Sequence, residues 1–171
     1  MIRNANRTIP LRRLFAVVLS LSVLTATACG SSSPAIDDAT VAPTLDAAAV
    51  AFLDDAQTLL ANVSAAGTRV AEVLDRADVS SEPWRGEALS ILAALRAELA
   101  GAELLSDPDS MRDVRAQLVE ATRQYDAASG LFADGIRDLD LDKIESAAGA
   151  LADAIVELAN ARAALDGAGR P

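Results

Sequence analysis

The apolar residues of this 171-residue chain alternate at steps of three and four along almost its whole length beyond residue 44. Such a spacing places them on one face of an α-helix, because an α-helix has 3.6 residues per turn. The first run predicts a helix about 50 Å long that extends to about Ala77, with Thr44 as its cap and Asp46 in its first turn. Its predicted core positions are Leu45, Ala49, Phe52, Ala56, Leu59, Val63, Ala66, Val70 and Val73.

Three further runs with the same spacing follow, and turn-forming residues separate them. Residues 78–84, DVSSEPW, interrupt the pattern first. Ser81 is expected to cap the second helix, with Pro83 in its first turn. The third helix is expected to begin with Asp107 as its cap and Pro108 as its first residue. The predicted core positions of these runs are Ala88, Leu92, Leu95, Leu99 and Ala102; Met111, Val114, Leu118, Ala121, Tyr125, Ala128, Phe132, Gly135 and Leu139; and Leu141, Ile144, Ala148, Leu151, Ile155, Leu158 and Leu165.

The junction between the third and fourth runs has the weakest turn signal. Residues 137–145, RDLDLDKIE, contain neither glycine nor proline. Asp138, Asp140 and Asp142 are the possible caps for a new helix here. Asp142 followed by Glu145 resembles a capping box, which favours a turn. The alternative is one continuous helix of about 58 residues, which would lack a partner of matching length within the chain and would require a dimer.

Four amphipathic helices joined by short connections pack most simply as an antiparallel up-down-up-down bundle. The expected fold class is therefore all-α, with a single four-helix bundle domain over residues 44–167, a normal size for one domain. Alanine is frequent at the predicted core positions, so the helices are expected to approach one another closely.

The first 28 residues have the organisation of a secretory signal peptide. They contain four arginines and no acidic residue, and their second half, residues 14–28, is the apolar stretch LFAVVLSLSVLTATA. This stretch of about 15 residues is shorter than the roughly 20 that a membrane-spanning helix needs. A removable signal peptide is therefore favoured over a permanent transmembrane anchor.

The only cysteine of the chain follows this stretch directly. Ala26-Thr27-Ala28-Cys29 resembles the lipobox of bacterial lipoproteins, in which small residues precede an invariant cysteine. The resemblance implies that Cys29 is lipidated, that the signal is cut just before it, and that the protein is anchored to the outer face of the cytoplasmic membrane. The alternative is a secreted chain with an unpaired cysteine, which is unusual in an oxidising compartment.

Residues 29–43 would then form the lipidated cysteine and a flexible tether. The sequence that follows Cys29, GSSSPAIDDATVAP, has no sustained apolar period. Fourteen residues of this composition span about 20 Å on average, so the bundle is expected to lie close to the membrane without being embedded in it.

Charge argues against nucleic acid as a partner. The chain has 15 basic and 25 acidic side chains. Removal of residues 1–28 would leave 11 basic and 25 acidic ones, a net charge of −14. Binding to nucleic acid needs cationic contacts with phosphates, which such a surface does not favour.

The chain contains no histidine, which limits the chemistry that it offers. Ser-His-Asp and Cys-His centres and the usual zinc and copper sites are therefore excluded. Asp138, Asp140 and Asp142 match the start of an EF-hand calcium loop, but Lys143 and Gly149 replace the glycine and the glutamate that this loop requires. We therefore expect no enzymatic activity, no metal site and no cofactor.

These observations favour a membrane-anchored, extracytoplasmic lipoprotein that acts as a non-enzymatic interaction module. Its partner would be another envelope protein or a peptide lying along a groove between helices. The alternative is an envelope carrier or sensor that binds a small apolar ligand inside the bundle. Phe52, Tyr125 and Phe132 lie at predicted core positions and would line the pocket for such a ligand. The pattern leaves the oligomeric state open.

Overall fold

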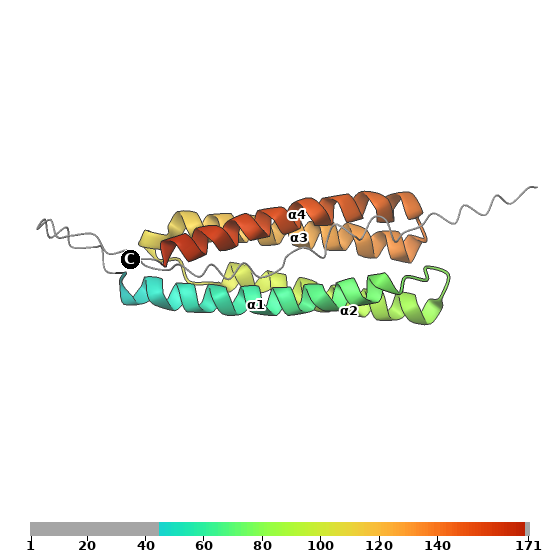
Figure 1. The fold of residues 1–171 in the computed structure, drawn as a ribbon, viewed down its shortest axis with the longest axis horizontal. Helices are drawn as coiled ribbons and strands as arrows, with labels where there is room; N and C mark the ends of the chain where they lie inside the picture. Colours follow the sequence, from blue (N-terminus) through green and yellow to red (C-terminus); the bar gives the residue numbers. More distant parts are fainter. Residues whose placement is uncertain (1–44, 170–171) are drawn as a thin grey trace, which may run out of the picture.

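The computed structural model describes residues 45–169, which form a bundle of four long α-helices. The helices run alternately up and down and lie side by side along one axis (Figure 1). The fold is therefore the all-α four-helix bundle that the apolar spacing predicts. The predicted signal peptide, Cys29 and the tether lie outside the described residues. The elements are α1 (Ala47–Asp75), α2 (Glu82–Ala100), η3 (Gly101–Leu104), η4 (Asp109–Met111), α3 (Arg112–Asp138) and α4 (Leu141–Ala168), where η3 and η4 are short 3-10 helices.

The core lies along the facing sides of the helices, where the predicted core positions of α1 and α2 are buried with the exception of Leu45. On α4 the outcome is different. Ala148, Ile155 and Leu158 are only partly buried, because α4 packs on the bundle through a neighbouring face. Leu139 and Leu141, also predicted as core positions, are about half exposed at the turn that precedes α4. The buried residues of α4 are Ile144, Ala147, Leu151, Ala154, Ala161 and Leu165.

The first two helices begin at capping side chains close to the predicted positions. Asp46 itself caps α1, since its Oδ1 accepts the N–H of Ala49 at 2.7 Å. Thr44, the predicted cap, lies outside the described residues. Ser81 caps α2 as predicted, and the buried indole of Trp84 donates a hydrogen bond to the carbonyl oxygen of Val73 at 2.9 Å. This bond joins the start of α2 to the end of α1.

The third helix begins later than predicted. Pro108 has an extended backbone, with φ −70° and ψ 136°, and η4 separates it from the first residue of α3, Arg112. Asp107 does not cap the helix. Its carboxylate lies 4.0 Å from the guanidinium of Arg115, which also donates to the carbonyl oxygen of Leu105. The carboxylate of Asp107 therefore lies beside an arginine side chain of α3 instead of accepting hydrogen bonds from backbone N–H groups.

The junction between α3 and α4 is a turn, so the alternative of one continuous helix is wrong. Leu139 takes the left-handed conformation, with φ 55°. The N–H of Asp140 donates to the carbonyl oxygen of Gly135 and the N–H of Leu139 to that of Ile136, a Schellman arrangement. Asp140, not Asp142, caps α4 by accepting the N–H groups of residues 142 and 143. Lys143 pairs with Asp138 at 2.6 Å across the turn.

Replacing Leu139 with glycine is expected to raise the free energy of unfolding by about 1 kcal/mol, because a side chain in the left-handed region carries a penalty that glycine avoids. The side chain is 54% exposed, so little apolar burial is lost. Urea unfolding of the mature chain without lipid (residues 29–171 with Cys29→Ser) measures the effect. Leu141→Gly is the control and is expected to destabilise, since Leu141 is equally exposed but helical. A loss of stability in Leu139→Gly would contradict the assignment.

Candidate functional site

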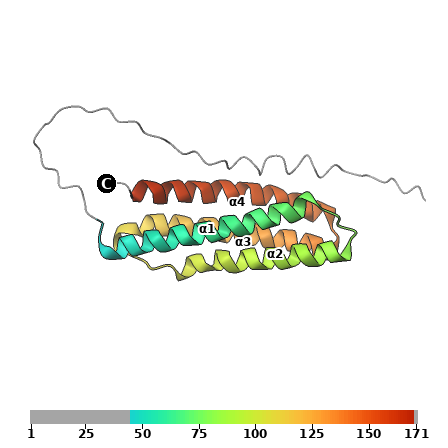
Figure 2. The ribbon, with the colours of Figure 1, turned by 60° about the horizontal axis from the view of Figure 1, so that its bottom comes forward.

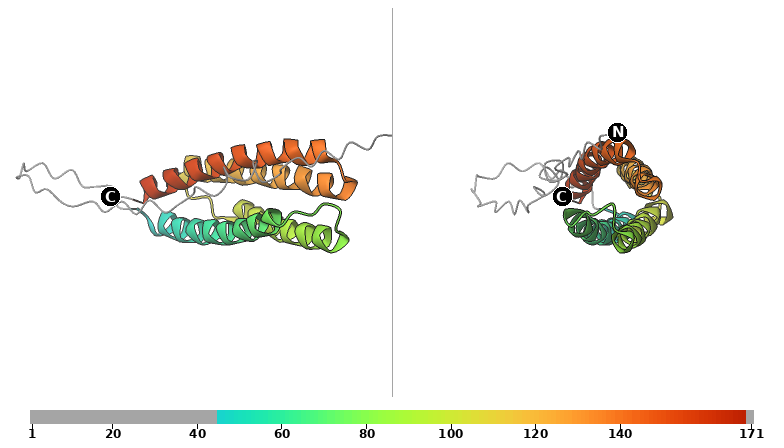
Figure 3. Two further views of the ribbon diagram at one scale, coloured as in Figure 1. Left: turned by 45° about the vertical axis from the view of Figure 1, so that its right-hand side comes forward. Right: turned by 90° about the vertical axis from the view of Figure 1, so that its right-hand side faces the viewer.

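One pair of neighbouring helices leaves an open groove. Close packing joins α3 to α4, α1 to α2 and α2 to α3, whereas α1 and α4 make few close approaches. The end-on view in Figure 3 shows the four helices around a common axis, and Figure 2 shows α4 apart from α1 at the end where α1 begins and overlapping it in the view where α1 ends. Between α1 and α4 lies a groove of about 500 Å³, with Tyr125 of α3 at its floor. This volume is within the range of pockets that bind small ligands.

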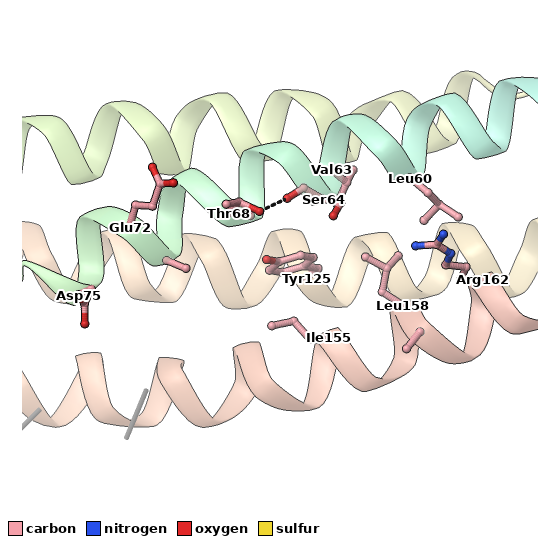
Figure 4. Close-up of a pocket in the computed structure, with 13 residues that line it drawn as sticks. Leu60, Val63, Ser64, Thr68, Glu72, Asp75, Tyr125, Ile155, Leu158 and Arg162 are labelled. Carbon is pink, nitrogen blue, oxygen red and sulfur yellow. Dashed lines mark hydrogen bonds between the residues drawn. The ribbon is translucent and has the colours of Figure 1, made fainter. Parts of the chain in front are cut away.

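Small side chains line much of the α1 wall of the groove. On α1 the lining includes Ser64, Gly67, Thr68 and Ala71, which follow the larger Leu60 and Val63 along the helix. On α4 it includes Ala159 between Ile155 and Arg162. The α1 wall extends from Leu60 to Asp75, a separation of fifteen helical steps or about 22 Å. The groove is therefore long and narrow and follows the bundle axis (Figure 4).

Tyr125, a largely buried residue, places its hydroxyl group at the floor of this groove. Only 7% of the residue is exposed, and its hydroxyl forms no hydrogen bond with another group of residues 45–169. A Cβ atom at position 67 would lie 3.3 Å from the hydroxyl oxygen, so Gly67 is the residue of α1 that faces it. Burial raises the pKa of the Tyr125 phenol above its usual value, which keeps the group protonated at neutral pH.

The hydroxyl of Thr68 is engaged within its own helix. Its Oγ1 donates to the backbone carbonyl oxygen of Ser64 at 3.0 Å. Figure 4 shows the Tyr125 ring below these two residues, with its oxygen on the side of Thr68 rather than of Leu158. The Tyr125 hydroxyl is therefore the polar group of the groove floor that remains available to a ligand.

The two ends of the groove carry opposite charges. Glu72 and Asp75 lie at the end where α1 terminates, and Arg162 lies at the other end, near Leu60 (Figure 4). All three charged side chains are exposed, and none of them belongs to an ion pair among the residues that the structure describes. The groove is therefore electrically polarised along its length.

Of the aromatic residues predicted to line a pocket, the structure places one in this groove. Tyr125 lines it, whereas Phe52 and Phe132 are fully buried in the core and do not. Cys29, the predicted lipidation site, lies outside the described residues. Sequence reasoning missed Glu72, Asp75 and the small residues of α1. Their signal was the sequence SAAGT at residues 64–68, which places small and polar side chains beside an otherwise apolar face.

The two acidic residues that line the groove both belong to α1. Glu72 and Asp75 lie three residues apart on the same helix, rather than on opposite walls as a pair of acids acting on a bound substrate requires. Within residues 45–169, no three side chains of His, Cys, Asp or Glu gather to form a metal site. None of the helices in the described part of the chain has the length and apolar character needed to cross a membrane.

Comparison with known proteins gives no match: no family model, no curated protein and no solved structure corresponds to this chain.

Proposed function

We propose that this protein is a lipid-anchored protein of the cell envelope whose bundle binds an elongated, mainly apolar ligand between α1 and α4, without acting as an enzyme. The groove of about 500 Å³ above the buried Tyr125 carries this proposal. A bundle that served only as a rigid spacer would gain stability by closing this gap with larger side chains. The small residues that hold it open instead keep apolar surface accessible from solvent.

The anchoring part of the proposal is supported by the sequence around Cys29. A lipid on this cysteine and the following tether would lead directly into the start of α1. The end of the bundle where α1 begins and α4 ends would then lie nearest the outer face of the cytoplasmic membrane. The acidic end of the groove, at Asp75, would lie at the far end and open away from the membrane.

An interaction module remains the second candidate function, and one observation favours it. Leu139 and Leu141 at the turn between α3 and α4 are about half exposed. They lie at the end of the bundle opposite to the start of α1, where another envelope protein would reach them. These two side chains form a smaller apolar feature than the groove, so ligand binding is the function that the geometry supports better.

A substitution that fills the groove tests the proposal. Gly67→Leu would project a side chain over the Tyr125 hydroxyl, and it improves the helix propensity of α1 because glycine disfavours helices. The mature chain without lipid is titrated with N-phenyl-1-naphthylamine, an uncharged apolar fluorophore. We expect wild type to enhance its fluorescence, and Gly67→Leu to weaken binding by about tenfold or more because the ligand would have to displace the new side chain.

Gly149→Leu is the matched control. Gly149 is also a helical glycine, but a Cβ atom there would meet nothing within 4 Å, and it does not line the groove. This variant is expected to bind the fluorophore as wild type does. Absence of binding to wild type, or equal loss in both variants, would refute the groove as the site.

A further inference from the structure

The groove differs in chemistry between its two ends. Leu60, Val63 and Leu158 make one end apolar, with Arg162 at its rim (Figure 4). At the other end Glu72 and Asp75 stand at the rim, and the small Ala71 leaves the space between them and Tyr125 open. A ligand that matches both ends has an apolar tail and a cationic head.

We propose that the groove binds a single-chain cationic amphiphile, with its head at Glu72 and Asp75 and its hydrocarbon tail directed past Tyr125 towards Leu60. This inference rests on the proposed function, since it specifies the ligand of the same groove. The head is an ammonium or a guanidinium group, which a carboxylate binds through charge-assisted hydrogen bonds.

The dimensions of the groove suit a single extended chain. Glu72 lies twelve helical steps after Leu60, which corresponds to about 18 Å along α1. An extended chain advances about 1.2 Å per single bond, as three bonds of a polypeptide span about 3.6 Å. Ten to twelve carbons and a head group therefore cover roughly this length. A whole helix, about 10 Å across, would need far more space than the groove's 500 Å³.

The carboxylates are free to attract a cation. Two arginines flank these acids along α1. Arg69, three residues before Glu72, forms no ion pair among residues 45–169, and Arg76 pairs with Glu87 at 3.1 Å and donates to the backbone carbonyl oxygen of Glu72. Arg162 lies near the level of Leu60, about 18 Å along the axis from Glu72. This separation exceeds the screening length of about 8 Å at physiological ionic strength, so Arg162 does not neutralise the acidic end.

The hydroxyl of Tyr125 is a second, independent indication of a ligand. The residue is only 7% exposed, yet its hydroxyl faces the open groove and forms no hydrogen bond with another group of residues 45–169. Figure 4 shows its oxygen on the side of the acidic end. It is therefore placed to accept a hydrogen bond from the head group, while the tail continues over the ring.

The negative charge of the whole chain also favours a cationic ligand over an anionic one. The net charge is −10 for the full sequence, which raises the local concentration of cationic ligands and lowers that of anionic ones. An anionic amphiphile would lie in the reverse orientation, with its head at Arg162, and the negative charge of the protein would disfavour its binding. Cationic and anionic probes with the same tail distinguish the two orientations.

Three probes with the same tail test the inference. Decylammonium, decanoate and decanol are titrated as competitors of N-phenyl-1-naphthylamine bound to the mature chain without lipid. The titrations are made at pH 7, at low ionic strength and below the micelle concentrations of the probes. We expect decylammonium to bind about tenfold more tightly than decanoate, the combined effect of two exposed carboxylates. The double variant Glu72→Gln/Asp75→Asn should lose this tenfold preference and bind decanol within about twofold of wild type.

The matched control is Asp54→Asn/Asp55→Asn. It changes the net charge equally on the same helix, at exposed positions that do not line the groove. This control should keep the preference for decylammonium within about twofold. Tyr125→Phe retains the ring and should weaken decylammonium about threefold more than decanol, as expected for loss of one hydrogen bond.

The outcomes separate the inference from the proposed function. If all three probes bind with equal affinity, the inference is wrong, but the proposal that the groove binds apolar ligands stands. Tighter binding of decanoate, abolished by Arg162→Gln, would likewise overturn it in favour of the reverse orientation. If none of the three probes binds, both the inference and the proposed function fail. An equal loss of preference in the Asp54/Asp55 control would show that net charge, rather than this site, selects the ligand.

Discussion

Replacing Cys29 with alanine is expected to abolish lipid labelling of the protein completely and to leave a precursor that retains residues 1–28. Alanine has no thiol to accept a diacylglyceryl group, and the resemblance of residues 26–29 to a lipobox implies that the signal is cut at the lipidated cysteine. The measurement combines metabolic labelling with an alkyne-bearing fatty acid and intact mass analysis of wild type and variant from the membrane fraction.

Ser31→Ala is the control for this experiment. Ser31 lies two residues after Cys29, in the predicted tether, and its replacement should leave labelling and cleavage unchanged. The alternative of a secreted chain with an unpaired cysteine makes the opposite prediction. In that case Cys29→Ala would be cut and released as wild type is, and the wild-type protein would show a free thiol. Either observation would remove the lipid anchor from the proposed function.

The loss of the anchor should also change what the bundle can reach. Two or three acyl chains on one cysteine hold a protein stably at a membrane, whereas a single chain holds it weakly. Held by a tether of about 20 Å, the groove would sample ligands close to the membrane surface. Without the anchor the same groove would sample only ligands in free solution.

Most of the fold could be predicted from the sequence because apolar spacing reports directly on helices. The start of α2 follows Ser81 as predicted, because serine is a preferred N-cap residue and proline is favoured in the first turn of a helix. The turn between α3 and α4 was also predicted, but its cap was not. Leucine disfavours the left-handed conformation that Leu139 adopts, so the end of α3 at this residue could not be predicted from the residue type. Without that end point, no local signal distinguished Asp140, the observed cap of α4, from Asp142.

The candidate site was much harder to predict. Apolar spacing shows which face of a helix is apolar, but it does not show how closely two neighbouring helices approach. Tyr125 was predicted as a pocket residue because it is aromatic and lies at a core position, and the same criterion selected Phe52 and Phe132, which lie elsewhere. What distinguishes Tyr125 is Gly67 on a helix distant in sequence, a relation that only the packed structure reveals.

Phe132→Ala is expected to lower the free energy of unfolding by about 3–5 kcal/mol, the usual cost of removing a buried phenylalanine side chain. Only 1% of Phe132 is exposed, and it is among the largest fully buried side chains of the bundle. Stabilities of single domains are about 5–15 kcal/mol, so this one substitution would remove about a fifth or more of the total. Urea unfolding of the mature chain without lipid, followed by circular dichroism at 222 nm, measures the loss.

Leu131→Ala is the matched control, because Leu131 precedes Phe132 on the same helix and is 55% exposed. Its replacement should change stability by less than about 0.5 kcal/mol. The pair also decides between two roles for Phe132. A core residue, as the structure places it, loses stability on truncation and leaves fluorophore binding within about threefold while the protein is folded. A pocket residue would show the reverse, with weakened binding and a stability loss below about 1 kcal/mol, because the side chain would then border solvent or ligand rather than packed neighbours.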